Sequence, residues 1–157
     1  MDRFKVFDVL HHEHLSLVSL TLCENTSLKE VFEQLERKGI KIKFLVCHRA
    51  TENSAYVNFC IERSGLKTTL NTLTELLHAD TPIDIFPEAG MVGIHGQHFD
   101  EQPGILDVMH NCLSSRGLKI LAISTTVSTS FFILPASEVV KATDLLKEAF
   151  EIPQGKI

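Results

Sequence analysis

The sequence contains no tryptophan and only one tyrosine among its 157 residues. Single-stranded nucleic acids are usually held by bases stacked on aromatic side chains, and this scarcity leaves no such platform. An excess of basic residues is also missing, since 15 lysines and arginines stand against 20 acidic residues, a formal net charge of −5. Binding a phosphate backbone requires a basic face, so we expect no nucleic-acid partner.

Long apolar runs are missing too. No stretch of about 18 apolar residues is present, so we expect neither a membrane span nor a membrane partner. The first residues, Met1 to Lys5, do not lead into the apolar stretch of a secretory signal. The four cysteines form no Cys-x-x-Cys pair, and Cys47, Cys60 and Cys112 interrupt apolar stretches, as reduced, buried thiols do. These features predict a cytoplasmic protein of one domain or two small ones.

The motifs of nucleophilic and phosphate-transferring enzymes are absent. The sequence has no Gly-x-Ser-x-Gly and no glycine-rich phosphate loop. Cys47 and His48 are neighbours, but neighbouring side chains of a strand point to opposite faces and could not act as nucleophile and base. We therefore expect no catalysis in this chain on its own, and no cofactor.

Histidines are the residues that suggest a metal site. His11, His12 and His14 surround Glu13, and a second pair is formed by His95 and His98. Metal ligands must converge, and in an extended segment only the first and third of three residues share a face. We interpret the first cluster as an exposed turn with ordinary histidines and expect no metal. A small metal-binding protein remains an alternative.

A repeat is the main positive feature. The segment Arg116 to Ile120 lies 78 residues after Lys38 to Ile42 and echoes it, with Gly117 matching Gly39. Apolar residues at helical spacing precede each glycine. They are Leu28, Val31 and Leu35 in the first copy, and Leu106, Met109 and Leu113 in the second. We predict in each half an amphipathic helix ended by a glycine in the left-handed conformation.

The remainder of each half continues in parallel. A strand precedes the helix, two strands follow it, and a second amphipathic helix ends the half. The ranges are 15–22, 40–47, 54–61 and 66–78 in the first half, and 91–95, 118–123, 129–134 and 136–150 in the second. Each half therefore has the predicted element order β-α-β-β-α. This order indicates an α+β, ferredoxin-like unit, in which two helices cover one face of an antiparallel sheet.

Such a unit usually closes with a fourth strand. Residues 82–86 are the candidate in the first half, whereas Pro153 and Gly155 discourage a strand at the end of the second. The chain begins with a surplus strand, 4–10, which we infer fills the vacant edge of the second unit. We expect interleaved units at 14–88 and at 3–10 plus 89–152, with a tail at 153–157.

Motifs of the second half resemble a known family. The segment 96–105, Gly-Gln-His-Phe-Asp-Glu-Gln-Pro-Gly-Ile, opens a helix with Pro-Gly, and 121–126, Leu-Ala-Ile-Ser-Thr-Thr, ends a strand. Both are similar to the paired ACT domains at the C-terminus of aspartokinases. Phe7 to His14 resembles the strand and turn that lead into the first ACT domain there, a strand that also completes the second. The resemblance covers nearly the whole chain.

The resemblance implies regulation. ACT pairs of aspartokinases bind an amino acid, commonly lysine or threonine, and usually work as homodimers. It implies that the chain is the allosteric, amino-acid-binding part of an enzyme of amino-acid biosynthesis, such as lysine biosynthesis. The implied partner is an aspartokinase catalytic subunit or domain. Free N–H groups at a helix N-terminus would suit the effector carboxylate. The candidate effector-binding residues are Glu24, Asn25, Thr26, Ser27, Cys47 and His48 in the first unit, and Asp100, Gln102, Gly104, Ser124, Thr125 and Thr126 in the second.

The first unit departs from the family pattern. Its loop, 23–27, has no Pro-Gly, and Cys47-His48 stands where effector-binding relatives commonly have Gln-Asn. In the second unit the stretch 124–130 is rich in hydroxyl side chains. We interpret it as a β-hairpin turn with its strand ends, with a ligand contact as the alternative. The alternative for the whole chain is a stand-alone ACT scaffold that acts through protein contacts without binding an amino acid.

Overall fold

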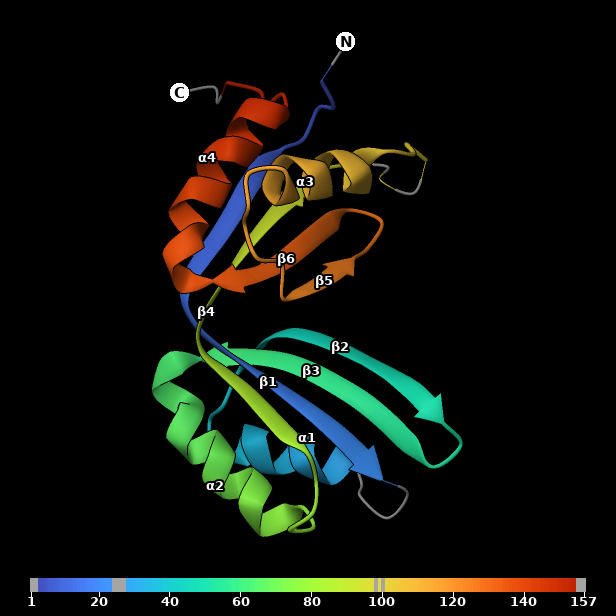
Figure 1. Ribbon diagram of the computed structural model, residues 1–157, viewed down its shortest axis with the longest axis vertical. Coiled ribbons are helices and arrows are strands. Elements are labelled where there is room, and N and C mark those ends of the chain that lie inside the picture. Colours follow the sequence, from blue (N-terminus) through green and yellow to red (C-terminus); the bar gives the residue numbers. More distant parts are fainter. Residues whose placement is uncertain (1–2, 24–27, 98, 100, 155–157) are drawn as a thin grey trace. The chain divides into compact units, whose positions relative to one another are not determined.

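The computed structural model describes residues 3–23, 28–97, 99 and 101–154. The chain divides into two compact units, which are described separately below. The central unit is His14–Glu88, and the terminal unit combines Met1–Glu13 with Ala89–Ile157. Within the described residues, antiparallel strands and four α-helices confirm the α+β class (Figure 1). None of the described helices is both long and apolar enough to span a bilayer.

The central unit has the strand order β2-β3-β1-β4. Strand β3 pairs antiparallel with both β1 and β2, and both helices cover one face of the sheet (Figure 1). A 3-10 turn, η1, leads directly into α2. The elements are β1 (Asp8–Cys23), α1 (Leu28–Arg37), β2 (Ile42–Thr51), β3 (Ser54–Glu62), η1 (Arg63–Gly65), α2 (Leu66–Leu76) and β4 (Ile83–His95).

Alternate residues of the strands build the core of the central unit. Side chains two apart on a strand share a face, and this face packs against the apolar stripes of α1 and α2. The helices contribute Val31, Leu35 and Leu73. The strands contribute Val18, Leu20, Leu22, Val57, Phe59 and Ile61.

The terminal unit has the order β1-β4-β6-β5, with α3 and α4 on one face (Figure 1). Its core includes Phe132 and Leu134 of β6 with Met109 and Leu113 of α3. The 3-10 turn η2 leads into α4, as η1 leads into α2. The elements beyond β1 and β4 are α3 (Ile105–Ser114), β5 (Ala122–Thr125), β6 (Thr129–Pro135), η2 (Ala136–Glu138) and α4 (Val139–Ala149).

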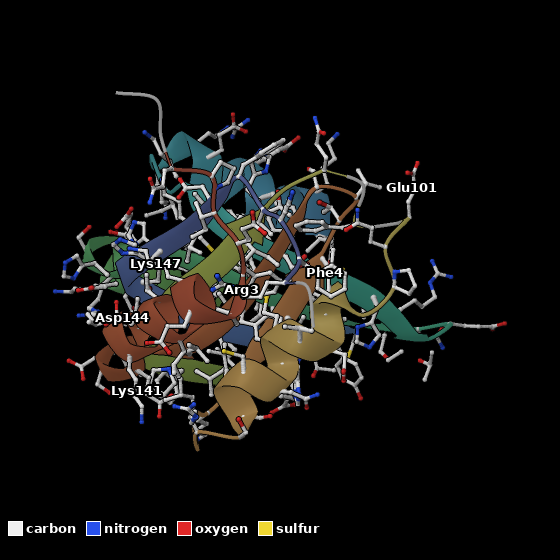
Figure 2. The ribbon with its side chains drawn as sticks, turned by 90° about the horizontal axis from the view of Figure 1, so that it is seen from above. Arg3, Phe4, Glu101, Lys141, Asp144 and Lys147 are labelled. Atoms are coloured by element: carbon white, nitrogen blue, oxygen red, sulfur yellow. The ribbon has the colours of Figure 1, made fainter. Side chains whose placement is uncertain are left out.

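The start of the chain is held inside the terminal unit. The Phe7 N–H donates to the His95 carbonyl of β4 at 2.7 Å, while Val6 N–H donates to the Glu151 carbonyl at 3.0 Å. Val6 itself is 1% exposed and belongs to the core of this unit. Arg3 Nη1 donates to the Glu148 carbonyl near the end of α4 at 2.9 Å (Figure 2). The first residues therefore supply both backbone partners and core side chains to a unit built mainly from the second half of the chain.

Both predicted glycine stops are confirmed. Gly39 and Gly117 each have φ of 76°. In the first copy, Gly39 N–H donates to the Glu36 carbonyl at 2.9 Å and Ile40 N–H to the Leu35 carbonyl at 3.0 Å. In the second copy, Gly117 N–H and Leu118 N–H make the matching pair to Ser114 and Leu113, at 3.0 and 3.2 Å. This is the Schellman motif, which satisfies the last carbonyls of a helix.

The same caps show that the predicted starts of two strands were wrong. Residues 40 and 118 were predicted to begin strands, but their N–H groups close the preceding helices. Strand β2 accordingly begins at Ile42 and extends to Thr51, and β5 begins only at Ala122. The predicted ranges 54–61, 66–78 and 129–134 agree with β3, α2 and β6 to within two residues at each end.

Two pairs of strands that were predicted separately are continuous. Residues 8–10 of the predicted strand 4–10 and all of 15–22 lie in one strand, β1, whereas 4–7 precede it; 83–86 and 91–95 both lie in β4. The histidine segment 11–14 is therefore not the exposed turn that we predicted. It contains no glycine, proline or asparagine to turn the chain. Pro87 is tolerated inside β4, where its carbonyl accepts a hydrogen bond from Ser16 Oγ at 2.6 Å.

Candidate functional site

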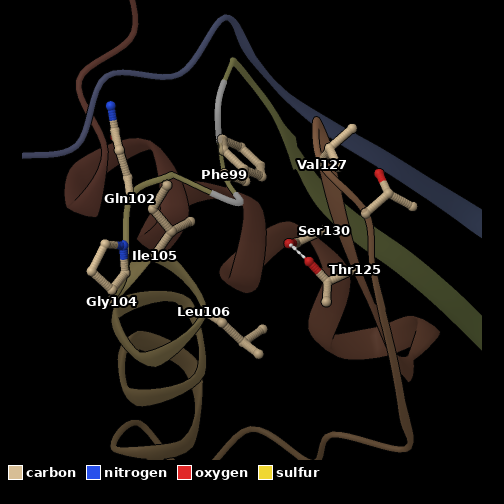
Figure 3. A pocket seen from close by; sticks show the side chains of 10 residues that line it. Phe99, Gln102, Gly104, Ile105, Leu106, Thr125, Val127 and Ser130 are labelled. Carbon is tan, nitrogen blue, oxygen red and sulfur yellow. Dashed lines mark hydrogen bonds between the residues drawn. The ribbon is translucent and has the colours of Figure 1, made fainter.

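A cavity of about 490 Å³ lies in the terminal unit, between the start of α3 and the β5–β6 hairpin (Figure 3). This volume is within the usual range of small-molecule sites. One wall comes from the β4–α3 loop and the first turn of α3, and the other from the hairpin. The lining residues are Phe99, Gln102, Pro103, Gly104, Ile105, Leu106, Thr125, Thr126, Val127 and Ser130.

The first wall is set by the way α3 begins. Gly104 precedes the helix with φ of 102°, a conformation that L side chains rarely adopt, and it offers no side chain to cap the helix. Its carbonyl accepts the N–H of Val108 at 3.0 Å, so the N–H groups of Ile105 and Leu106 have no acceptor within the helix. Ile105 is buried in the core and fixes this turn. The cavity thus faces a helix N-terminus, which favours an anionic group.

The second wall carries a pair of hydroxyl groups. Thr125 and Ser130 lie opposite each other in the hairpin, and their oxygens are 2.6 Å apart (Figure 3). Either hydroxyl can donate to the other, and the one that accepts keeps its own proton for a ligand. Ser130 is 1% exposed, so its oxygen is held in one place.

Backbone hydrogen bonds join the two walls. Phe99 N–H donates to the Val127 carbonyl at 3.0 Å, and Gly96 N–H donates to the Ser128 carbonyl at 2.9 Å. The tip of the hairpin is therefore fixed to the loop that leads into α3. A ligand in this cavity would touch both at once, so its binding would stabilise their present arrangement.

Of the predicted site residues in the second unit, four line this cavity: Gln102, Gly104, Thr125 and Thr126. The Thr126 hydroxyl is already used in the turn, where it donates to the Thr129 carbonyl at 3.2 Å and accepts the Ser128 and Thr129 N–H groups. Gln102 extends away from the hydroxyl pair (Figure 3). The Thr126 hydroxyl is therefore taken up by the turn, whereas the Thr125 hydroxyl pairs with that of Ser130.

Ser124 and Asp100 differ from those four. Ser124 lies opposite Phe131 in the hairpin, whereas Thr125 lies opposite Ser130. Neighbouring residues of a strand face opposite sides of the sheet, so the structure does not bring Ser124 to the cavity. Asp100 is outside the described residues.

Of the predicted residues of the first unit, the structure describes Cys47 and His48. Cys47 and His48 are consecutive in β2 and therefore face opposite sides of the sheet. The His48 ring meets the Tyr56 ring edge-on at 5.3 Å, beside a hollow of about 320 Å³ that Asn58 and Asp84 also line. Glu24, Asn25, Thr26 and Ser27 lie outside the described residues.

Neither metal ligands nor reactive thiols gather in the part of the chain that the structure describes. It contains no group of three or more histidine, cysteine and acidic side chains that could hold a metal ion, and His98 is outside it. Burial raises the pKa of the Cys60 thiol to about 12. Burial also raises the pKa of Cys112, whose thiol donates to the Leu145 carbonyl at 3.3 Å. Both thiols are protonated at neutral pH and are poor nucleophiles.

Sequence reasoning missed most of the cavity's apolar lining. Phe99, Leu106 and Val127 were not among the candidates, although Phe99 stands within the motif at 96–105. Ser130 was also missed. The predicted hairpin at 124–130 could have indicated it, because closing the chain around residues 127 and 128 pairs Thr126 with Thr129 and places Ser130 opposite Thr125.

Comparisons with known proteins agree on one fold. No family model matches the sequence. The aspartokinase of Bacillus sp. (strain MGA3) is 24% identical over 129 residues, 81% of this chain and 31% of that protein, so the chain spans about a third of its length. The regulatory subunit of aspartate kinase from Thermus thermophilus has a TM-score of 0.80 and 20% identity, over 93% of this chain and 99% of that one.

A structure of aspartokinase alpha and beta subunits is also similar, with a TM-score of 0.77 and 16% identity, over 92% of this chain and 97% of that one. At such identities the likeness shows the fold. The resemblance to aspartokinase regulatory regions that the sequence predicted is confirmed.

Proposed function

We propose that this chain is a regulatory module of aspartokinase type, which senses an amino acid and performs no catalysis itself. In this proposal the central and terminal units are two ACT domains, at 14–88 and at 3–10 plus 89–152. Two findings support it: the likeness to a regulatory subunit over nearly that subunit's whole length, and the cavity at the start of α3. The cavity carries the proposal, because it combines a helix N-terminus with a fixed hydroxyl pair.

The binding mode follows from the two walls. The effector carboxylate is placed at the first turn of α3, where the N–H groups of Ile105 and Leu106 lack acceptors within the helix. The hydroxyl pair of Thr125 and Ser130 offers both a proton and lone pairs to the rest of the ligand's polar end. A zwitterionic amino acid matches this combination of an anion site and oxygen acceptors.

Regulation requires that the effector bind two states of the protein differently. Only that difference in affinity can shift an equilibrium, so the effector acts by favouring one arrangement of a homodimer, or of the module with its catalytic partner. The likeness to a structure of aspartokinase alpha and beta subunits supports a catalytic aspartokinase subunit or domain as that partner.

Thermal unfolding and calorimetry with each of the twenty amino acids test the proposal. At a hundred times its dissociation constant, the effector should stabilise the chain by about 2.7 kcal/mol. The double variant Thr125→Val, Ser130→Ala should lose most of this shift. The matched control Ser124→Val changes a hydroxyl on the opposite face of the same strand and should keep it. If no amino acid moves the melting temperature, this chain does not sense one.

A second candidate is a scaffold that acts through protein contacts alone. It is favoured by three exposed apolar side chains of α3 and the β5–β6 hairpin, Leu106, Ile123 and Val127. In that case Val127→Asp would abolish self-association or partner binding in sedimentation experiments, while no amino acid would change the melting temperature of the unaltered chain.

A further inference from the structure

Apart from Gln102 and the threonine and serine hydroxyls, the described side chains that line the terminal unit's cavity are apolar. Phe99, Ile105, Leu106 and Val127 contribute hydrocarbon, while Thr125 and Ser130 contribute the bonded hydroxyls. Among the described residues that line it, none carries a charge. The cavity therefore has polar groups on both walls, at the start of α3 and at the hydroxyl pair, with the hydrocarbon of Phe99, Leu106 and Val127 beside them.

Three of the apolar lining residues come from different elements. Phe99 comes from the β4–α3 loop, Leu106 from the first turn of α3 and Val127 from the hairpin turn (Figure 3). Leu106 is 41% exposed and Val127 62%, which leaves hydrocarbon in contact with water at the mouth of the cavity. Exposed apolar surface that clusters around a cavity commonly marks a binding site. An aliphatic group placed among these three side chains would remove that surface from water.

A charged ligand side chain fits poorly here. An ammonium group moved from water into this lining would lose hydration, and no described carboxylate among the lining residues would compensate it. A hydroxyl group placed between Phe99, Leu106 and Val127 would likewise leave hydrogen bonds to water unreplaced. An aliphatic side chain enters this part of the cavity without such a loss.

We infer that the ligand of this cavity is an amino acid with an aliphatic side chain, of the valine, leucine or isoleucine class, and that Leu106 is a specificity-determining residue. The inference rests on the proposed function, since the carboxylate and ammonium of the amino acid occupy the polar groups at the start of α3 and at the hydroxyl pair. It replaces the lysine or threonine expected from the family resemblance with a ligand chosen by the chemistry of the lining.

Calorimetric titration of the full chain with valine, leucine, isoleucine, threonine and lysine tests the inference. The best aliphatic amino acid should bind at least about tenfold more tightly than lysine. Valine and threonine have nearly the same shape, so their comparison isolates the hydroxyl, and valine should bind more tightly. Preferred binding of lysine or threonine would overturn this inference and leave the proposed function intact. Binding of no amino acid would overturn both.

Two variants of one residue make the test directional. Leu106→Ala removes hydrocarbon from the cavity and should weaken the best aliphatic ligand about tenfold. Leu106→Glu adds a carboxylate and should shift the preference toward lysine. Val140→Ala is the control, because Val140 is also an exposed apolar residue of a helix in the terminal unit, α4, and is not among the residues that line the cavity. Equal affinities for the aliphatic ligand in Leu106→Ala and the unaltered chain would refute the role of Leu106.

Discussion

The ring of Phe99 lies so close to the backbone of Gly96 that a β-carbon on Gly96 would come within 2.6 Å of it. Real β-carbons do not approach other atoms so closely, so this packing depends on glycine. The same two residues donate the backbone hydrogen bonds that fix the loop to the hairpin. Gly96 therefore determines where Phe99, one wall of the cavity, can lie.

Gly96→Ala should displace the Phe99 ring and reshape the cavity. We expect a loss of stability of about 1–3 kcal/mol from overpacking, and about tenfold weaker binding of the amino acid ligand. Gly65→Ala is the control, since its β-carbon would meet the end of the Ile40 side chain at 2.8 Å in the central unit. The control should leave ligand affinity unchanged. Unaltered affinity in Gly96→Ala, measured by calorimetry, would mean that the Phe99 ring does not shape the site.

Gly117→Ala tests the left-handed helix stop in isolation. An added β-carbon would meet nothing within 4 Å, so the only cost is the backbone conformation at φ of 76°. We expect a loss of about 1 kcal/mol in urea unfolding, and the same for Gly39→Ala in the central unit. Gly117→Asn should cost less, because asparagine tolerates this conformation. An alanine variant as stable as the unaltered chain would contradict this account of the cap.

Val6→Ala tests whether the start of the chain stabilises the terminal unit. The substitution removes two buried carbon groups from its core, which should cost about 2 kcal/mol. Amide hydrogen exchange should show reduced protection in α3 and α4, with α1 and α2 little changed. The control Val18→Ala, in the core of the central unit, should produce the reverse pattern. If both variants reduced the hydrogen-exchange protection of all four helices equally, the two units would not have separate cores.

Cys60 should make stability fall at alkaline pH. Burial raises its pKa in the folded chain from an ordinary value of 9.0 to about 12. The protonated thiol is thus favoured by folding. The contribution of this pKa shift to the free energy of unfolding is fully present below about pH 9 and is lost as the pH rises toward 12. The expected slope is about 1.4 kcal/mol per pH unit in that window.

Urea unfolding of the unaltered chain and of Cys60→Ala, at several pH values between 8 and about 11, measures this slope. Other groups titrate in both proteins and cancel in the comparison. The difference in stability between the two should shrink as the pH rises. A constant difference would show that Cys60 does not titrate on unfolding.

The fold was predictable where a local feature fixes it. Gly39 and Gly117 indicate in the sequence where their helices end, because few other residues adopt the conformation that a Schellman cap requires. The continuity of β1 was not predictable, because its polar histidine segment carries no alternating apolar pattern. That segment is extended because it lies between two stretches that pair with β3 and β4, and pairing between distant strands is invisible in a local pattern.

The candidate site was predictable only in part, and for a related reason. Gly104 and Thr125 stand in motifs that resemble a family, and the structure places both at the cavity. Leu106 and Val127 are apolar, and in a sequence an apolar residue at a cavity looks the same as one in the core. Their exposure, which distinguishes them, is known only once α3 and the hairpin have been placed within the unit.

The pairing of Val6 with Glu151 has a consequence for synthesis of the chain on the ribosome. The central unit is a contiguous segment and can begin to fold once residue 88 has emerged. The terminal unit cannot be completed until its last residues are available, so Val6 and Val9 remain exposed to water throughout that interval. Burial of Val6 and Val9 is therefore among the last steps in the folding of the terminal unit.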